Sequence, residues 1–509
     1  MNMNAKLLRL TTVVLIMTFS VSLLWSFVQP LYGSPDETAH VVKAVATASG
    51  QLKGQKSTGD FGFSSETYNV PTAYAQGIQY LGCILGPSRA DASCIGPFAT
   101  GRKTTPVTST AAHYPPLYYM LVGPAGLAFP GSFGMYLMRV VSSMLTAIML
   151  TLAFRTALRF GGPLRAAGVI AACTPMVFSL SGAVNPHGLE ISASILFWVT
   201  LLTSLEQFRS SGNEPLERSL AFQLFLASVF FALVRPAGFI WMSIATLLIV
   251  SYVGLREIFK LFALNRSRLK ILLSVPFALM LSVVFYLLSG VGSSLGGNAE
   301  KGSERVLDNL WIAFDRGDDY FRYMFGWFGW VEFSAPPMAF FLCIGCLALA
   351  LTYAVQNGNG RESRSALMAL VFTIFLPILL EGLKAASSGF GYQGRYTLAI
   401  AVGIPILGFW RRSEALSLQA ERRLMSMVLI VAMLPTLICI DFALKRYSVG
   451  ESGPRFWFLD PNWLPPGGMP LICALLIVIF SSFIMLIVYL RQSLFDENPN
   501  RNEDQIQLA

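Results

Sequence analysis

The sequence predicts an all-α polytopic membrane protein with about twelve transmembrane helices and a long first loop outside the cytoplasm. Three observations predict this class. The 509 residues are 54% hydrophobic and only 13% charged, whereas soluble domains are about one quarter charged. Apolar stretches of roughly 17 to 25 residues, the length that crosses a bilayer as a helix, recur along the chain. Clusters of Lys and Arg separate alternate stretches, as they do in cytoplasmic loops.

The predicted spans cover most of the chain. They are 7–28, 135–158, 164–182, 188–206, 219–235, 237–254, 270–290, 338–355, 366–386, 395–410, 424–443 and 470–490. The first begins with Lys6 and Arg9 like a signal peptide, but it is longer than a usual signal and lacks a clear cleavage site, so we expect an uncleaved anchor. The basic clusters all fall on one side if both termini are cytoplasmic. We therefore expect a multi-pass protein of the bacterial plasma membrane.

This topology gives one transmembrane domain, residues 1–490, followed by a polar cytoplasmic tail, 491–509. Three long segments, 29–134, 290–337 and 445–470, lie outside the cytoplasm. Loops much longer than about 15 residues are usually functional or disordered. The aromatic and apolar residues throughout these segments favour helices folded back onto the membrane surface, with the chemistry outside the cytoplasm. Cys83 and Cys94 both lie in the first segment, where a disulfide can form and persist.

The stretch SPDETAH, residues 34–40, follows the first span directly. Ser34 and Glu37 have the spacing of a reciprocal capping box, and the intervening Pro35 suits the first helical position. The pattern therefore predicts a helix along the outer membrane surface. Capping does not explain His40, which lies one turn beyond Asp36 on the same helical face. The chain has three histidines, His40, His113 and His187, and the topology places all three outside the cytoplasm.

An ordered set of motifs gives a family resemblance that covers nearly the whole chain. The motifs are SPDETAH, HYPPLYY (113–119), FGWFGWVE (325–332), YQGRYTL (392–398) and KRY…WLPP (445–466). The set resembles the GT-C superfamily of membrane glycosyltransferases, and more closely the bacterial family named domain of unknown function 2142. One departure is Asn185-Pro186-His187, where an acidic residue is expected from the family pattern. The resemblance implies a GT-C-like fold and a donor sugar linked to a polyprenyl phosphate.

The chemistry of such a transfer needs two kinds of group. The leaving phosphate is weakly basic and needs no general acid, but a carboxylate must take the proton of the acceptor hydroxyl. A cationic pocket must stabilise the charge that develops on the lipid phosphate. A single displacement assisted by one base inverts the configuration at the anomeric carbon. The resemblance places the catalytic acidic residue in the first-loop motif, so Asp36 is our first candidate base, Glu37 the second, and His40 an orienting group.

The remaining candidates lie near the outer ends of the predicted spans or in the motifs of the external segments. For the donor phosphate these are Arg395, Lys384, Arg446 and Arg235; for the substrates they are His113, Tyr114, Tyr118, Trp330 and Gln393. We expect Lys384 to converge with Arg395, although an ion pair with Glu381 is an alternative role for this lysine. Tyr114, Tyr118 and Trp330 are candidates for a surface on which the sugar stacks, and an interfacial aromatic belt explains them equally well. No cofactor is certain, and a divalent metal bound through Asp36 remains open.

The expected partners are a polyprenyl-phosphate-linked sugar, an envelope glycan, lipid or protein acceptor, and membrane lipids. Nucleic acid is not among them, because the net charge of +9 is dispersed over many loops instead of forming one patch. Two other function classes fit the topology. A transporter or flippase of lipid-linked sugars would share the cationic lipid site, but we see no repeat relating the two halves of the chain. A glycan polymerase or ligase would not need the carboxylates of the first loop.

Overall fold

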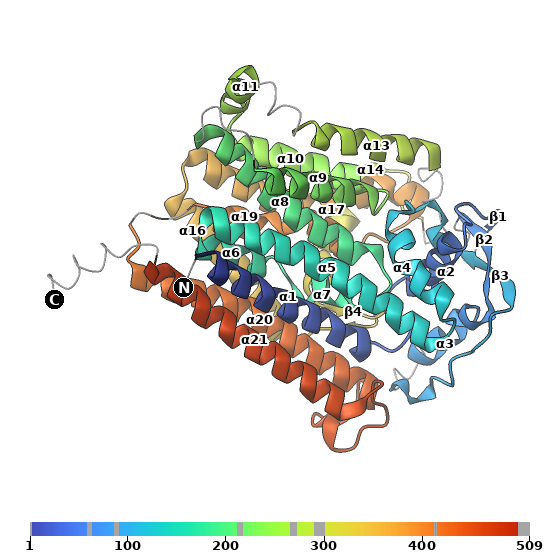
Figure 1. Cartoon of the computed structure of the whole chain (residues 1–509). Helices are drawn as coiled ribbons and strands as arrows, with labels where there is room; N and C mark the ends of the chain where they lie inside the picture. Colours follow the sequence, from blue (N-terminus) through green and yellow to red (C-terminus); the bar gives the residue numbers. More distant parts are fainter. Residues whose placement is uncertain are drawn as a thin grey trace.

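The computed structural model describes residues 3–58, 64–85, 91–210, 217–264, 272–289, 301–411, 413 and 415–496. Most of the predicted cytoplasmic tail, and residues 290–300 of the second external segment, lie outside these ranges. The described chain is a bundle of long helices with a lobe of short helices and strands at one end (Figure 1). The helical, polytopic class predicted from the sequence is confirmed.

Seven helices are long and apolar enough to cross a membrane. They are α1 (Met3–Val28), α5 (Ser132–Gly161), α8 (Pro186–Ser210), α16 (Pro337–Asn357), α17 (Gly360–Ser388), α20 (Leu418–Val449) and α21 (Gly468–Asp496). The helix α8 is buried along its whole span, and its polar side chains, Glu190 among them, are buried with it. The N-terminal residues of α8 therefore lie inside the protein.

The other five predicted spans coincide with shorter or bent helices. The helices α6 (Pro163–Ala171) and α7 (Pro175–Ser181) meet at an angle of 68°, where Pro175 cannot continue the preceding helix. The helices α9 (Arg218–Leu233), α10 (Gly238–Val253) and α13 (Ser274–Ser289) have 16 residues each, short of the roughly 20 that a bilayer needs. The fifth of these predicted spans, 395–410, is divided into three short helices, η6 (Gly394–Thr397), α18 (Leu398–Ala401) and α19 (Gly403–Gly408). Seven spans, or eight if α6 and α7 form one, are present among the described residues; twelve stays a prediction.

The segment 29–134, predicted to lie outside the cytoplasm, forms the lobe at the right of Figure 1. Its elements are α2 (Glu37–Ala48), β1 (Gln55–Thr58), β2 (Ser64–Pro71), η2 (Thr72–Tyr74), α3 (Gly77–Ile84), η3 (Ala92–Cys94), β3 (Thr104–Ser109), η4 (Thr110–His113) and α4 (Leu117–Ala128). The strands form an antiparallel sheet in the order β1-β2-β3, in which Tyr68 pairs with Val107. The sequence prediction of surface helices alone missed this sheet. A disulfide joins Cys83 to Cys94.

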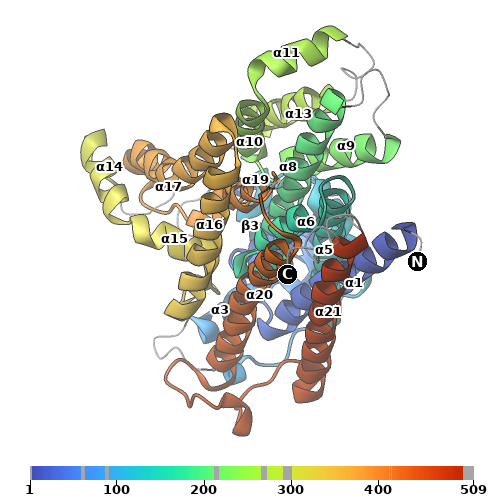
Figure 2. The ribbon, with the colours of Figure 1, turned by 90° about the vertical axis from the view of Figure 1, so that its left-hand side faces the viewer.

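The other two segments predicted to lie outside the cytoplasm contain further short elements. The helices α14 (Val306–Asp315) and α15 (Gly317–Phe325) project beside α17 in Figure 2. A short hairpin of β4 (Trp327–Phe328) and β5 (Phe333–Ser334) follows them. The remaining short elements are α11 (Leu255–Leu264) and η7 (Trp457–Leu459). The helix α15 packs on η6, so close that a Cβ on Gly394 would overlap the carbonyl of Tyr320. This contact fixes the start of the YQGRYTL segment.

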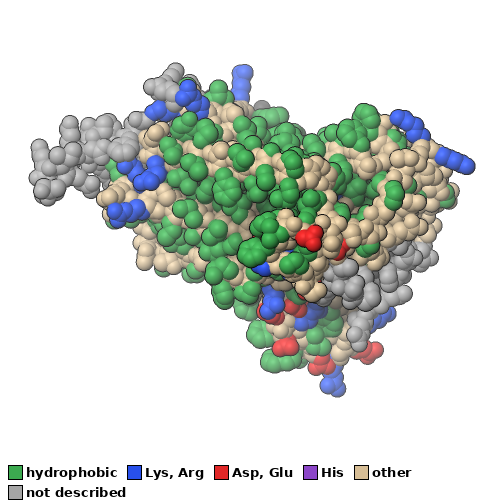
Figure 3. Space-filling model, turned by 90° about the horizontal axis from the view of Figure 1, so that it is seen from below, with side chains coloured by type: hydrophobic (Ala, Val, Ile, Leu, Met, Phe, Trp, Pro, Cys, Tyr) green, Lys and Arg blue, Asp and Glu red, His purple; other side chains and the backbone are tan. Residues whose placement is uncertain are grey.

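The surface divides along the long axis of the bundle. Hydrophobic side chains cover the middle of the face in Figure 3. Lys and Arg side chains lie without Asp or Glu at its left-hand end, which is the end where both termini lie in Figure 1. Further Lys and Arg side chains lie at the right-hand end and, together with Asp and Glu, in the lower part of the view. The lobe with the SPDETAH segment is at the opposite end of the bundle from the termini (Figure 1).

Candidate active site

Asp36 lies at the bend that leads into α2. Its backbone has φ +61°, one of three non-glycine residues with positive φ in the described ranges, and such strained positions are concentrated at functional sites. Its side chain is 51% exposed, and one carboxylate oxygen lies 3.5 Å from a guanidinium nitrogen of Arg395. The helix begins at Glu37 without a side-chain cap. The predicted capping box of Ser34 and Glu37 is therefore wrong, because the carboxylate of Glu37 is bound elsewhere.

Glu37 is fully buried in a network of four hydrogen bonds. Its oxygens accept from Nε and Nη2 of Arg139 at 2.8 and 2.5 Å and from the backbone N–H groups of Tyr32 and Val184 at 3.0 and 2.9 Å. Arg139 also donates to the carbonyls of Ser26, Gln29 and Pro30. This pair ties the end of α1 to α5 and to the turn before α8. The setting favours a structural role for Glu37 and leaves Asp36 as the exposed carboxylate of the motif.

His40 faces the same region from the next turn of α2. The ring nitrogen Nδ1 lies 2.8 Å from the hydroxyl of Tyr119, and the ring meets that of Tyr114 edge-on at 5.1 Å. Burial, followed by the positive charges of Arg235 and Arg395, lowers the pKa of His40 to about 3. The imidazole is therefore neutral at physiological pH, and the hydrogen bond with Tyr119 fixes its orientation.

Arg235 forms a second buried ion pair beside His40. Nη1 donates to Oε2 of Glu190 at 2.8 Å, and the guanidinium lies over the rings of Tyr396 and Tyr114 at 5.2 and 6.0 Å. The Glu190 side chain has no exposed surface. Since Glu190 takes up the charge of Arg235, this arginine is less available to a ligand than Arg395.

Arg395 has an incomplete set of partners. Its side chain is 2% exposed and its described polar contact is the 3.5 Å approach to Asp36. Its Nε and Nη1 atoms are buried and, among the described residues, have no hydrogen-bond partner. A buried guanidinium with free N–H groups is costly unless an anion or water meets them. Arg395 is therefore the strongest candidate for anion binding in the described structure.

The turn between α7 and α8 is docked onto the SPDETAH segment. Asn185 donates to the carbonyl of Pro35 at 3.0 Å and accepts from the backbone N–H of His187 at 3.0 Å. His187 is buried, with Nε2 3.5 Å from Glu190. The NPHGLE segment, residues 185–190, thus lies against the residue that precedes Asp36, although it departs from the family pattern.

Of the predicted substrate-binding residues, one contacts the site and the others lie in elements around it. Tyr114 belongs to the site through its contacts with His40 and Arg235. His113, Tyr118 and Trp330 instead connect neighbouring elements. Nδ1 of His113 lies 2.8 Å from the carbonyl of Ser289. The hydroxyl of Tyr118 donates to Ser142, and the indole N–H of Trp330 donates to the carbonyl of Tyr32. Gln393 precedes η6, and its buried Oε1 lacks a partner among the described residues.

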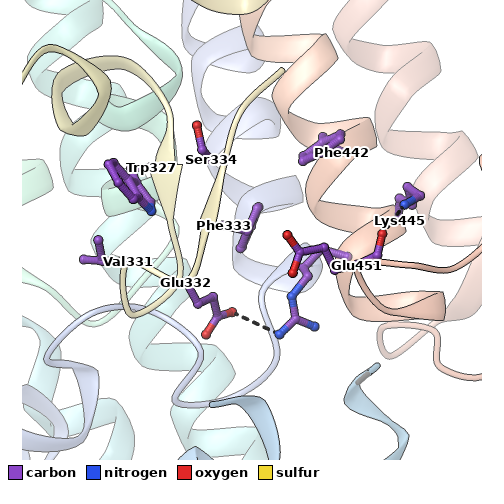
Figure 4. A pocket seen from close by; sticks show the side chains of 9 residues that line it. Trp327, Val331, Glu332, Phe333, Ser334, Phe442, Lys445 and Glu451 are labelled. Carbon is purple, nitrogen blue, oxygen red and sulfur yellow. Dashed lines mark hydrogen bonds and ion pairs between the residues drawn. The ribbon is translucent and has the colours of Figure 1, made fainter. Parts of the chain in front are cut away.

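Two predicted phosphate ligands lie apart from Arg395. Lys384 is exposed on α17, and its side chain makes no ion pair within the described ranges; the expected contacts with Arg395 and with Glu381 are both absent. Arg446 lies 3.8 Å from Glu332 beside a cavity of about 220 Å³ between the β4–β5 hairpin and α20 (Figure 4). Its guanidinium also donates to the carbonyl of Ile84.

A metal site at Asp36 finds little support in the surrounding residues. Within the described ranges no group of three or more His, Cys, Asp or Glu side chains could hold a metal ion. The charged neighbour of Asp36 is a guanidinium, and guanidinium groups bind anions. The residues that surround Asp36 fit a phosphate better than a cation.

Sequence reasoning missed three residues that shape the site. Arg139 was hidden within an apolar span, where an isolated charge usually marks a partner in the protein interior. Glu190 lies one turn beyond His187 in NPHGLE, and Tyr396 directly follows Arg395 in YQGRYTL. The i,i+3 spacing of His187 and Glu190 at a helix start was the signal that could have identified the pair.

Comparisons with known proteins identify the chain by family. The family described as "Predicted membrane protein (DUF2142)" matches residues 19–404. Two solved structures of ArnT from Cupriavidus metallidurans, bound to undecaprenyl phosphate and in the apo state, are each 13% identical to the chain. The alignments cover 96% and 97% of this chain and 77% and 76% of those chains, with TM-scores of 0.42 and 0.41. No curated protein matches the sequence.

Proposed function

The chain belongs to the DUF2142 family of membrane proteins, and we propose that it is an inverting GT-C-type glycosyltransferase. It moves a sugar from a polyprenyl-phosphate donor to an envelope glycan, lipid or protein on the outer side of the plasma membrane. One observation carries this proposal. The half-exposed carboxylate of Asp36 lies 3.5 Å from a buried Arg395, whose two other guanidinium nitrogens are free of partners among the described residues.

The two groups match the two requirements of the reaction. Asp36 takes the proton of the acceptor hydroxyl while that oxygen bonds to the anomeric carbon. The bond from this carbon to the phosphate oxygen breaks, and the electron pair leaves with the polyprenyl phosphate. Arg395 stabilises the charge that develops on that oxygen. The donor phosphate also draws Arg395 away from Asp36, which keeps the carboxylate available as a base.

The carboxylates of the site support an inverting outcome. Asp36 directly precedes α2 and supplies one candidate base, and a single displacement assisted by one base inverts the configuration at the anomeric carbon. The remaining described carboxylates of the site, Glu37 and Glu190, are each bound to an arginine. No second free carboxylate is thus described here to act as a nucleophile in a retaining mechanism.

The distribution of charge supports an extracytoplasmic site. At the end of the bundle that carries both termini, Lys and Arg are visible without Asp or Glu, although further Lys and Arg lie elsewhere on this face (Figure 3). An excess of Lys and Arg is typical of the cytoplasmic side of membrane proteins. The site is at the opposite end, in a lobe with the Cys83–Cys94 disulfide, and disulfides persist outside the cytoplasm. A donor that reaches this side must be a lipid-linked sugar.

The test is sugar transfer by the purified chain in lipid nanodiscs. Undecaprenyl-phosphate-linked labelled glucose, galactose and mannose serve as donors and an envelope fraction as acceptor. Asp36→Asn keeps the shape of the side chain but lacks the base, and should lower transfer about 10²- to 10⁴-fold. Asp318→Asn is the matched control, because this carboxylate also lies beside an arginine, 3.4 Å away, on the exposed surface.

Two results would reject the proposal. One is transfer by Asp36→Asn at the rate of the unchanged chain. The other is a pair of negative results: the chain transfers sugar from none of these donors, and it binds undecaprenyl phosphate no more tightly than the Arg395→Gln variant does. A flippase would instead move labelled donor across the bilayer equally well with Asp36 or Asn at this position.

A further inference from the structure

The helices α20 and α21 enclose a groove at the end of the bundle that carries both termini. The two helices run side by side in two views (Figure 1, Figure 2), but α21 packs mainly on α1 and touches α20 only lightly. A cavity of about 330 Å³ lies between α20 and α21, and small-ligand sites occupy about 300 to 1,000 Å³. The residues that line this α20–α21 groove are Arg423, Ser426, Met427, Ile430, Val431 and Arg491.

The groove is basic at one end and apolar along its length. Positions 423, 426, 427, 430 and 431 are spaced as i, i+3, i+4, i+7 and i+8, so they share one face of α20. Arg423 is near the start of α20, and at about 1.5 Å per residue Val431 lies about 12 Å further along the helix. Arg491 is near the end of α21 and completes the basic end of the groove.

The charges at the basic end are not balanced within the groove. Arg423 and Arg491 are exposed and, in the described ranges, make no ion pair and no side-chain hydrogen bond. None of the described lining residues is acidic. Glu421 and Arg422, the neighbouring charges on α20, are of opposite sign and do not line the groove. The hydroxyl of Ser426, one turn from Arg423, is buried without a partner among the described residues, which indicates a ligand or an ordered water.

The apolar part of the groove faces the bilayer. Met427 and Ile430 are 45% and 49% exposed on a helix that is long and apolar enough to cross a membrane, so lipid chains surround them. A ligand that fits the groove therefore has an anionic group at one end and a hydrocarbon chain next to it. A phospholipid with a net negative charge has this order of groups, whereas a soluble anion lacks the chain.

We infer that the α20–α21 groove binds an anionic glycerophospholipid of the leaflet at this end of the bundle, which is the cytoplasmic leaflet in the predicted topology. The phosphate pairs with Arg423 and Arg491, as headgroups do in basic pockets between transmembrane helices. An ester oxygen accepts from Ser426, and one acyl chain lies along Met427 and Ile430. The lipid fills the space between two helices that touch only lightly. The inference is independent of the proposed transfer reaction, because the groove and the SPDETAH segment are at opposite ends of the bundle.

Native mass spectrometry of the full chain in detergent tests this inference. The probes are phosphatidylglycerol, which has one net negative charge, and phosphatidylcholine, which has none; both carry the same two acyl chains. Since each arginine near an anionic lipid contributes about 5-fold in affinity, phosphatidylglycerol should bind about 25-fold more tightly than phosphatidylcholine. Glycerol 3-phosphate, a soluble anion without a chain, should not displace the bound phosphatidylglycerol.

Substitutions in the groove separate the charge from the chain. Arg423→Gln and Arg491→Gln should each weaken the binding of phosphatidylglycerol about 5-fold and leave that of phosphatidylcholine unchanged. Met427→Trp places a large ring in the path of the acyl chain and should weaken the binding of both lipids. The control is Arg364→Gln, an exposed arginine near the start of α17, which should change neither. All four side chains are exposed, so the variants should fold, and the two lipids can be compared on the unchanged chain in any case.

Four results would overturn the inference. Equal binding of the two lipids by the unchanged chain removes the role of the charge, and displacement by glycerol 3-phosphate identifies a site for a soluble anion. A loss in Arg364→Gln as large as that in Arg423→Gln indicates general attraction to a basic surface. Acidic residues of the segment 497–509 are another candidate occupant. In that case the preference for phosphatidylglycerol is absent from the unchanged chain and emerges only in a Glu503→Gln/Asp504→Asn variant.

Discussion

Replacing Glu37 by Gln should destabilise the protein, in contrast to the same change at the neighbouring Asp36. In the structure, Oε1 of Glu37 accepts from Nε of Arg139 and from the N–H of Val184, and Oε2 accepts from Nη2 of Arg139 and from the N–H of Tyr32. Whichever oxygen becomes the amide nitrogen, that nitrogen faces two donors. Both orientations of Gln therefore lose two hydrogen bonds and leave Arg139 buried with no matching charge.

The magnitude follows from the complete burial of the pair, since both side chains have 0% exposure. Breaking a buried ion pair by removing one partner costs about 3 to 5 kcal/mol of unfolding free energy. The matched control is Glu217→Gln, whose pair with Arg159 is 36% and 42% exposed and should cost less than about 1 kcal/mol. The double variant Glu37→Gln/Arg139→Gln should cost less than the sum of the single changes, because no unmatched charge remains.

The assay is unfolding in mixed micelles with increasing SDS, followed by labelling of the buried thiols. Cys173, Cys343, Cys346 and Cys439 are buried and report unfolding, whereas Cys473 is exposed and gives the background. Transfer activity is normalised to the folded fraction. A Glu37→Gln chain whose stability stays within about 1 kcal/mol of the unchanged chain, while its normalised activity collapses, would refute the structural role and make Glu37 a catalytic residue.

Three further outcomes follow from the same region. Ser34→Ala should change the unfolding free energy by less than about 0.5 kcal/mol, because its hydroxyl is buried without a described partner; a loss near the 1 kcal/mol of a helix cap would restore the capping box. The pKa of His40 is lowered from 6.5 to about 3, so the unfolded state binds more protons between these values. Acidification below pH 6.5 should therefore lower the unfolding free energy by up to about 1.4 kcal/mol per pH unit. In His40→Gln, the dependence of the unfolding free energy on pH between 6.5 and 4.5 should be weaker. The same pH dependence in both chains would contradict the burial of a neutral imidazole. The Cys83–Cys94 disulfide closes a separation of 11 residues, so Cys83→Ser/Cys94→Ser should lower the stability of the outer lobe by about 3 kcal/mol in the chain-entropy model; limited proteolysis that attacks both forms equally would argue against this.

The sequence determined the helical class and the location of the apolar segments. Each of the twelve predicted stretches overlaps described helix, because hydropathy over a window of about 20 residues is a local property of the chain. The lengths of five segments could not be read in this way. The bend of 68° between α6 and α7 and the division of the 394–408 segment depend on packing in the interior. The outer strands were missed because a short strand needs a partner, and β2 pairs with β3 about forty residues further along the chain.

The sequence also supplied most of the residues of the site, but only the tertiary structure sorted them. Asp36, His40, Tyr114, Arg235 and Arg395 come together, whereas Lys384 stays on the surface and Arg446 lies beside another cavity. Asp36 and Glu37 have the same chemistry and adjacent positions. Asp36 is half exposed beside Arg395, which lies 359 positions later in the chain. Glu37 is buried in an ion pair with Arg139, 102 positions later. Whether a carboxylate serves as a base or as a structural anchor depends on its burial and its ionic partner, and distant parts of the chain supply both through folding.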